Sequence, residues 1–399
     1  MKEQNLTVLH IRMQSLAVFR QLLRDPVVAA LSDYLGCIGA DHAMAVAKYS
    51  EFVSRLYASE ETTLAGHIQR IVGDNENPFI CTVGKGETPD PQLEQSVWQE
   101  LDVLQTVAEL TPEDLRQPMT WDGFLPGFGI KTVDIPGMYA DRCRSIGKYG
   151  YGIYARHRMF YINTQNAIVP VRNPDRTRLS DLIDYKREQQ IILDNTLALM
   201  EGKPAANILL TGDAGTGKSS TVKAVVNELS DRGLRILEVR KEQLTHIPEI
   251  LDALNANPLK FILFIDDLSF QKSDDNFSAL KAILEGSVSA KSSNVVIYAT
   301  SNRRHLVKES FSDRDGDDIH RNDTMQELLS LSERFGIQIT FNKPDKETYL
   351  DIVLHLAQER GITMEEETLK AQAEQFALHR GGRSARAANQ FVDSLISKG

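Results

Sequence analysis

The spacing of apolar residues along the chain changes near residue 179. Before that point the spacing is mainly helical: residues 6–24 place apolar side chains about one turn apart until Asp25-Pro26, and residues 41–58 and 91–110 repeat the period. We therefore expect residues 1–150 to form a mainly helical N-terminal domain, in which no motif indicates a role.

Two segments between residues 120 and 178 depart from this helical period. Residues 120–137 are rich in Gly and Pro and are expected to form a loop. Residues 151–178 contain two β-prone runs on either side of Asn163–Asn166, which predicts a β-hairpin linker. If the first run is a strand, alternation places Tyr154, Arg156, Arg158 and Phe160 on one side of it.

From residue 179 onward, short apolar runs alternate with helical segments, which is typical of a parallel sheet covered by helices on both faces. We predict an α/β domain over residues 179–342. Beyond Pro344 the pattern is helical in three segments, and this predicts a helical domain over residues 343–399. The five predicted strands are residues 207–212, 234–239, 260–267, 294–301 and 337–341.

Composition and charge narrow the class of protein. A chain of 399 residues is too long for one ordinary core. A net charge of −10 argues against coating nucleic acid by bulk electrostatics. The three cysteines have no paired spacing, and no apolar run approaches the ~20 residues of a membrane helix. We expect a cytoplasmic protein that does not enter a membrane.

Residues 212–219 fit the pattern Gly-x4-Gly-Lys-Ser of a phosphate-binding loop between a strand and a helix. Glycines let successive backbone N–H groups face phosphate oxygens, and the lysine adds a positive charge toward the β and γ phosphates. The helix that follows places its positive end at the anion. The residues predicted to bind the nucleotide here are Gly212, Asp213, Ala214, Gly215, Thr216, Gly217, Lys218, Ser219 and Ser220.

Two carboxylates, Asp266 and Asp267, end the apolar run that begins at residue 260. The carboxyl end of a buried parallel strand opens at the ligand crevice of such a sheet. We expect Asp266 to hold Mg²⁺ together with the Ser219 hydroxyl, and Asp267 to orient the attacking water as a base. ATP and Mg²⁺ are therefore the predicted cofactors.

In their order along the chain, the phosphate loop, "FILFIDD", "NVVIYATSN", "LSERFG" and "GGRSARAANQF" resemble an AAA+ ATPase module with its helical lid, over roughly residues 180–399. More narrowly, "ILFIDDLSF" and "IYATSNRRHL" resemble a family of bacterial ATP-binding proteins with one such module. The double aspartate is similar to that of replication initiators and helicase loaders. The resemblance implies a five-stranded parallel sheet between helices, followed by a lid.

The resemblance also implies roles at the active site. Asn302 corresponds to the sensor that aligns the hydrolytic water, and Thr300 is the alternative. The hydrolytic position held by Asp267 usually carries Glu, so an aspartate there puts fast turnover in doubt. Arg334 corresponds to an arginine finger offered to a neighbouring subunit, which implies a ring-shaped or helical homo-oligomer, a hexamer among the options. A surface pair between Arg334 and Glu333 is the plain alternative.

Two further nucleotide contacts follow from the resemblance. Arg386 matches the lid arginine, with Arg383 as the competing choice. Ile183 and Tyr185 lie in the segment expected to pack on adenine, although a tyrosine facing the core would explain Tyr185 nearly as well.

The sequence leaves the roles of two charged regions undecided. Residues 142–178 hold eight Lys or Arg and one acid, interleaved with aromatic residues, and could bind nucleic acid. The structural alternative is a hairpin whose aromatic residues face the core and whose cations face solvent. The acidic insert 308–323 echoes a calcium loop, but Asp318 and Thr324 stand where that loop needs Gly and Glu, so we expect a surface loop.

These features together predict an oligomeric ATPase that remodels a protein or protein–nucleic-acid client whose identity the sequence does not name. The alternative is a slow ATP-dependent switch or loader that binds DNA or a DNA-bound partner. Persistent ATP-bound assemblies with very low turnover would distinguish this alternative from a remodeller.

Overall fold

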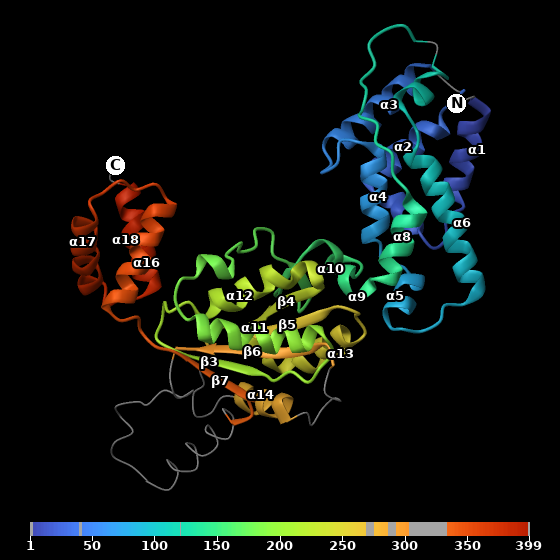
Figure 1. Ribbon diagram of the computed structural model, residues 1–399. Helices are drawn as coiled ribbons and strands as arrows, with labels where there is room; N and C mark the ends of the chain where they lie inside the picture. The colour runs from blue at the N-terminus through green and yellow to red at the C-terminus, as the bar shows by residue number, and fades with distance from the viewer. Residues whose placement is uncertain are drawn as a thin grey trace. The chain divides into compact units, whose positions relative to one another are not determined.

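The computed structural model divides the chain into two compact units, Met1–Arg156 and His157–Gly399, and each is described here by itself (Figure 1). The boundary falls inside the segment that the sequence indicates as a linker. The residues that the structure describes are 3–39, 42–119, 121–268, 275–285, 293–302 and 333–397.

The first unit is helical, as predicted, and its helices surround one apolar core. Residues 121–134 form a loop without helix or strand, apart from one isolated bridge between Gly129 and Thr63. The helices are α1 (Glu3–Gln14), α2 (Pro26–Gly36), α3 (His42–Tyr57), α4 (Leu64–Asp74), α5 (Pro78–Gly84), α6 (Pro91–Ala108), α7 (Pro112–Arg116), α8 (Ile135–Arg144), α9 (Ile146–Tyr149) and α10 (Ile153–Arg156), with a short 3-10 helix at Arg20–Arg24.

The helical period over residues 6–24 does not produce one helix, because α1 ends at Gln14. The backbone N–H groups of Ala17, Val18 and Phe19 donate to the carboxylate of Glu100 at 2.8, 3.1 and 2.9 Å. These donors are therefore engaged by a side chain of α6, 82 residues away for Val18, and the chain turns before the 3-10 helix.

We expect Glu100→Gln to lower the free energy of unfolding of the first unit by about 2–4 kcal/mol, because a buried amide replaces a carboxylate that accepts three hydrogen bonds. Both tryptophans, Trp98 and Trp121, lie in this unit, so urea unfolding followed by tryptophan fluorescence reports on it. Glu94→Gln, at an exposed position of the same helix, is the control. Equal midpoints for the two variants would contradict the role of Glu100.

The second unit contains a seven-stranded sheet in the order β2-β1-β4-β5-β6-β3-β7. The five predicted strands are present as β4, β5, β6, β3 and β7, and their pairing is parallel throughout. The strands are β1 (Met159–Ile162), β2 (Ile168–Pro170), β3 (Ile208–Gly212), β4 (Leu234–Val239), β5 (Lys260–Ile265), β6 (Val295–Ser301) and β7 (Ile337–Phe341).

The two additional strands are the predicted hairpin. β2 pairs antiparallel with β1, and β1 pairs in parallel with β4, Met159 standing opposite Ile236. The hairpin therefore extends the sheet. The predicted strand alternation over residues 154–160 is wrong, because Tyr154 and Arg156 belong to the helical turn α10 and the strand begins only at Met159.

Helices α11 (Lys186–Met200) and α12 (Lys218–Leu229) contribute to one core with residues of β3, β4, β5 and β6. Helix α13 (Ile247–Asn255) follows β4, and α14 (Asp275–Glu285) lies on the side of the sheet opposite α12 (Figure 1). Every residue of β3 and β6 is buried, which explains their unbroken apolar runs.

The three predicted C-terminal helices are present as α16 (Lys346–Glu359), α17 (Glu366–His379) and α18 (Ala385–Ile396), and they surround a separate small core. The strand β3, the parallel sheet and this C-terminal bundle follow one another along the chain in the order that the resemblance implies. Among the residues described, no helix combines the length and apolar character needed to cross a membrane.

Candidate functional site

The predicted phosphate loop connects the end of β3 to the start of α12. Gly212, Gly215 and Gly217 have φ angles of 135°, 81° and 90°, in the region that favours glycine. A Cβ at Gly212 would lie 2.0 Å from the carbonyl oxygen of Phe341 on the neighbouring strand β7, so only glycine fits there. Thr216 closes the loop by donating its hydroxyl to the carbonyl of Asp213 at 2.9 Å.

Lys218 is buried at the first position of α12. Its ammonium donates to the carbonyls of Gly212 and Asp213, both at 2.8 Å, and to Oδ1 of Asn302 at 3.0 Å. Burial lowers the pKa of Lys218, and nearby carboxylates, Asp213 the strongest, act in the opposite direction. The lysine thus occupies its three donors within the loop and on the predicted sensor.

The two aspartates that follow β5 contact different partners. Oδ1 of Asp266 accepts from the Ser219 hydroxyl at 2.6 Å. Oδ1 of Asp267 accepts from the Asn302 carboxamide at 2.7 Å. Because β5, β6 and β3 are adjacent and parallel, their carboxyl ends bring these side chains together with Lys218, which lies 84 positions from Asn302 in sequence.

Asn302, rather than Thr300, therefore contacts both Lys218 and Asp267. Thr300 instead bonds to the two aspartates: its hydroxyl donates to Oδ1 of Asp266 at 2.6 Å and accepts from the backbone N–H of Asp267 at 2.9 Å. The only sequence signal for this arrangement is that Thr300 and Asn302 are two positions apart, a spacing that places both side chains on the same side of a strand.

The phosphate loop, both aspartates, Thr300 and Asn302 line a cavity of about 450 Å³. Residues of α18 line it as well: the backbone N–H of Arg386 donates to the carbonyl of Gly215 at 3.3 Å, and Arg386 is exposed at the cavity. Arg383 is held within the bundle by two 2.8 Å hydrogen bonds to the carboxylate of Glu374. Of the two arginines, Arg386 and not Arg383 therefore lines this cavity.

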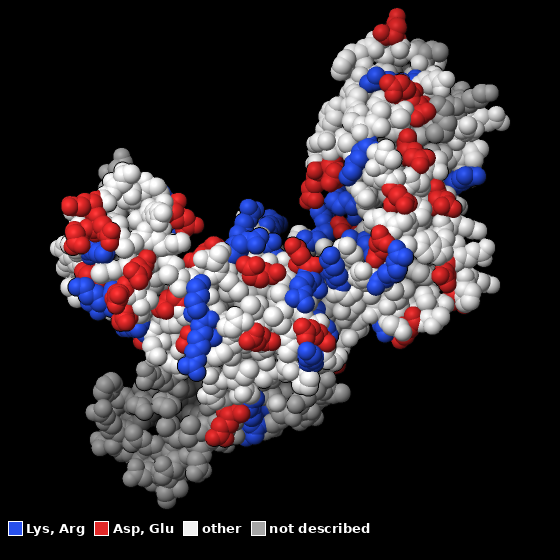
Figure 2. Space-filling view, viewed as in Figure 1, with Lys and Arg blue, Asp and Glu red and all other residues white. Residues whose placement is uncertain are grey.

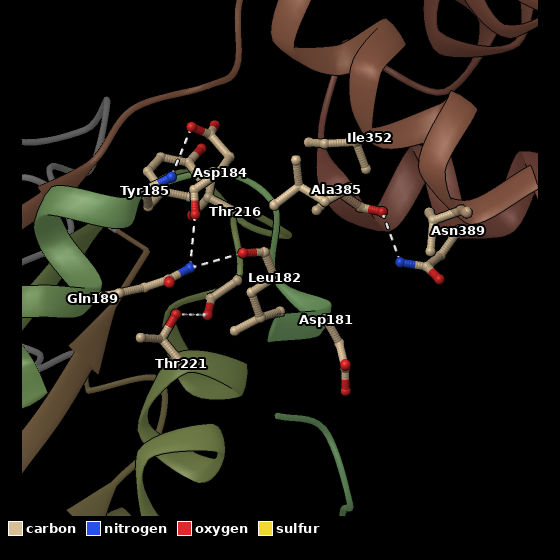
Figure 3. A pocket seen from close by; sticks show the side chains of 13 residues that line it. Asp181, Leu182, Asp184, Tyr185, Gln189, Thr216, Thr221, Ile352, Ala385 and Asn389 are labelled. Atoms are coloured by element: carbon tan, nitrogen blue, oxygen red, sulfur yellow. Dashed lines mark hydrogen bonds between the residues drawn. The ribbon is translucent and has the colours of Figure 1, made fainter. Parts of the chain in front are cut away.

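A second, smaller pocket of about 60 Å³ contains Ile183 and Tyr185 in its lining and shares Thr216 and Gly217 with the phosphate cavity (Figure 3). The Tyr185 hydroxyl donates to the carbonyl of Asn342, and its ring lies 4.8 Å from that of Phe341. Tyr185 is thus both a pocket residue and a core contact.

Gln189, buried in α11, was not predicted as part of this site. Its carboxamide donates to the carbonyls of Leu182 and Asp184 at 3.1 and 2.7 Å and so fixes the segment that carries Ile183 (Figure 3). A single glutamine within a helical pattern gives no sequence signal for such a role.

The predicted magnesium ligands are compatible with Mg²⁺. The Ser219 hydroxyl and the Asp266 carboxylate are hard oxygen donors 2.6 Å apart at the edge of the phosphate cavity. Among the described residues, no group of three or more His, Cys, Asp or Glu side chains is placed to hold another metal ion.

Arg334 does not line the phosphate cavity. It precedes β7, whose register with β3 runs from Ile337 opposite Ile208 to Phe341 opposite Gly212. Arg334 therefore lies at the amino end of these strands, whereas the phosphate loop lies at their carboxyl end, about 16 Å away along β3. Within one chain the two do not meet.

Several cations of the basic segment 142–178 form ion pairs, so the segment presents less positive charge to a binding partner than its sequence suggests. Acids from outside this run pair with several of its cations: Arg156 with Glu60 at 2.8 Å, Arg144 with Asp141, and Arg178 with Glu228 at 3.8 Å. Figure 2 shows acidic and basic side chains interspersed on the face of the molecule that it draws. These pairs favour the structural interpretation of the segment.

The acidic insert 308–323 lies outside the described residues.

A family model described as "Protein of unknown function (DUF815)" matches residues 155–399. A search of curated proteins gives no match. Among solved structures, the AAA domain of FIGL-1 in complex with ADP is 18% identical, with a TM-score of 0.35 and coverage of 50% of this chain and 66% of that one.

Two structures of the replication initiator DnaA are also similar, both at 18% identity, a TM-score of 0.40 and coverage of 57% of this chain. One is bound to AMPPCP and single-stranded DNA and is covered over 66% of its length; the other, from Aquifex aeolicus, is bound to AMPPCP and is covered over 67%. The chain thus spans about two thirds of the length of each of these structures, which are distant in sequence.

Proposed function

Because the chain belongs to the DUF815 family, whose description assigns no activity, we propose its function from the site: it binds ATP with Mg²⁺ and hydrolyses the β–γ phosphoanhydride bond. The observation that carries this proposal is one hydrogen-bonded network, at one cavity, that joins the phosphate-loop lysine and serine to two aspartates and Asn302.

Binding starts at the phosphate loop. The loop amides and the end of α12 receive the phosphates, and the Lys218 ammonium moves from the loop carbonyls toward the β and γ phosphates. Ile183 and Tyr185 border the base, and Arg386 reports on the nucleotide from the lid.

The residues that we propose to carry out hydrolysis line the same cavity. Ser219 and Asp266 would hold Mg²⁺, which supplies charge neutralisation at the phosphates. Asp267 accepts a proton from the attacking water, and Asn302, released from Lys218, orients that water. This reaction needs positioning and charge stabilisation more than covalent participation of the protein.

At the level of biology we propose an oligomeric remodeller of a protein or protein–nucleic-acid client, with Arg334 supplied by the adjacent subunit. The second candidate is a slow ATP-dependent switch or loader. Asp267 favours this candidate, because the carboxylate is one methylene shorter than the usual glutamate and is tied to Asn302. Turnover measured over a range of protein concentrations distinguishes the two.

Asp267→Asn tests the proposed chemistry. An amide cannot accept the proton of water, so we expect Mg²⁺-dependent phosphate release from ATP to fall by about 100-fold or more, with ATP affinity within about threefold of wild type. Asp252→Asn, at an exposed position of α13, is the control and should behave as wild type. If Asp267→Asn turns over at the wild-type rate, Asp267 is not the base. If the wild-type protein binds no ATP, the proposed function is wrong.

A further inference from the structure

Thr300 makes three hydrogen bonds to the segment that carries the two aspartates. Its side chain bonds to Asp266 and to the N–H of Asp267, and its carbonyl accepts from the N–H of Leu268 at 2.7 Å. Thr300 is only 2% exposed and lies on β6, two positions before Asn302. Its side chain therefore has little access to water, although it lines the phosphate cavity.

The direction of each bond at the Thr300 hydroxyl is fixed by chemistry. An ionised carboxylate can only accept, so the single hydroxyl proton is donated to Asp266. A lone pair of the same oxygen is then left to accept from the N–H of Asp267. One hydroxyl thus connects the two consecutive carboxylate residues.

The backbone at Asp267 shows why this support is needed. Its φ of 54° lies in the left-handed region, which is uncommon for residues other than glycine. This turn directs the Asp267 carboxylate to Asn302, whereas the Asp266 carboxylate meets Ser219. The N–H bond to Thr300 pins the backbone at the residue where the two directions separate.

The two hydroxyls on Oδ1 of Asp266 have different roles. Ser219 is also a candidate magnesium ligand, so its bond to Asp266 is exchangeable. Thr300 lies in the adjacent strand and is not a candidate magnesium ligand, so its bond can hold Asp266 both before and after the nucleotide binds.

We propose that Thr300 is a positioning residue that holds Asp266 at the magnesium site and Asp267 at the water site through one shared hydroxyl. The proposal rests on the proposed function and adds to it a specific dependence of nucleotide binding on Mg²⁺. Removing the hydroxyl should disturb the metal-dependent part of ATP binding together with hydrolysis.

The test compares Thr300→Val, which keeps the shape and removes the hydroxyl, with Thr300→Ser, which keeps the hydroxyl. Thr196→Val is the matched control, since Thr196 is a fully buried threonine of α11 whose hydroxyl also makes two hydrogen bonds away from the site. For each full-length variant we would measure ATP affinity in EDTA and in Mg²⁺, the Mg²⁺ concentration for half-maximal affinity, and phosphate release.

We expect Thr300→Val to bind ATP in EDTA as wild type does, to lose about tenfold of the gain in affinity that Mg²⁺ gives, and to hydrolyse ATP at least about tenfold more slowly. Thr300→Ser should regain most of both, and Thr196→Val should change neither. A wild-type Mg²⁺ response in Thr300→Val, equal losses in Thr196→Val, or no recovery in Thr300→Ser would each overturn the positioning role.

The measurements of ATP affinity distinguish a failure of this proposal from a failure of the proposed function. If the wild-type protein binds Mg·ATP but does not turn it over, the hydrolytic function fails while the Mg²⁺ response still decides the role of Thr300. If the wild-type protein binds no nucleotide with or without Mg²⁺, both proposals fail together.

Discussion

Lys218→Ala should reduce ATP affinity by about 100-fold to 1000-fold and leave no measurable hydrolysis, because the phosphates lose the buried ammonium of Lys218. The lysine ammonium donates to three acceptors, and these hydrogen bonds hold its charge at the cavity. Equilibrium binding of a fluorescent ATP analogue, followed by phosphate release at saturating ATP, checks the result.

Lys223→Ala is the matched control for this experiment. Lys223 lies on the same helix, one turn beyond the phosphate loop, and its ammonium is 3.7 Å from Glu238. It should bind and hydrolyse ATP as wild type does. Circular dichroism of both variants shows whether the helix content of the chain is retained. Wild-type affinity in a folded Lys218→Ala variant would mean that the loop is not the phosphate site.

The sequence predicted the centre of the site because its determinants are local. A phosphate loop needs particular residues at fixed spacing between a strand and a helix, and the parallel strand order then brings Asp266, Asp267 and Asn302 to the same edge. Strands β3, β5 and β6 were recognisable because buried parallel strands leave nearly continuous apolar runs, whereas β7 alternates between buried and more exposed residues.

What could not be predicted depends on contacts between distant residues. The break after Gln14 is explained by Glu100, and the hairpin joins the sheet only through its pairing with β4. The roles of Gln189 and Thr300 likewise follow from partners on other elements. A helical or β period in one segment carries no information about a hydrogen-bond partner elsewhere in the chain.

The aspartate in place of the usual glutamate has a local explanation in the structure. Aspartate and asparagine tolerate the left-handed region better than longer side chains do, and Asp267 adopts it. A short side chain at this turn also reaches Asn302 directly. The aspartate that the resemblance marks as unusual at this position is therefore suited to the backbone that carries it.

Arg334→Ala should lower ATP hydrolysis by about 1000-fold or more while ATP affinity stays near the wild-type value, if the guanidinium acts on the phosphate bound by a neighbouring subunit. The geometry behind this expectation is the separation of Arg334 from its own phosphate loop, at opposite ends of β3 and β7. Wild-type activity per subunit should accordingly rise with protein concentration. Arg232→Ala, an exposed arginine outside the site, is the control.

Mixing two inactive variants then decides whether the site is shared. Arg334→Ala subunits keep an intact phosphate loop, and Lys218→Ala subunits keep an intact Arg334. If the finger acts between subunits, an Arg334→Ala subunit that binds ATP can receive the arginine of a Lys218→Ala neighbour, so the mixture should hydrolyse ATP although neither variant does alone. Arg334→Lys should not replace it, because an ammonium lacks the planar fork of donors that the guanidinium presents. If no ratio of the two variants restores activity while both still assemble, Arg334 does not complete a neighbour's site.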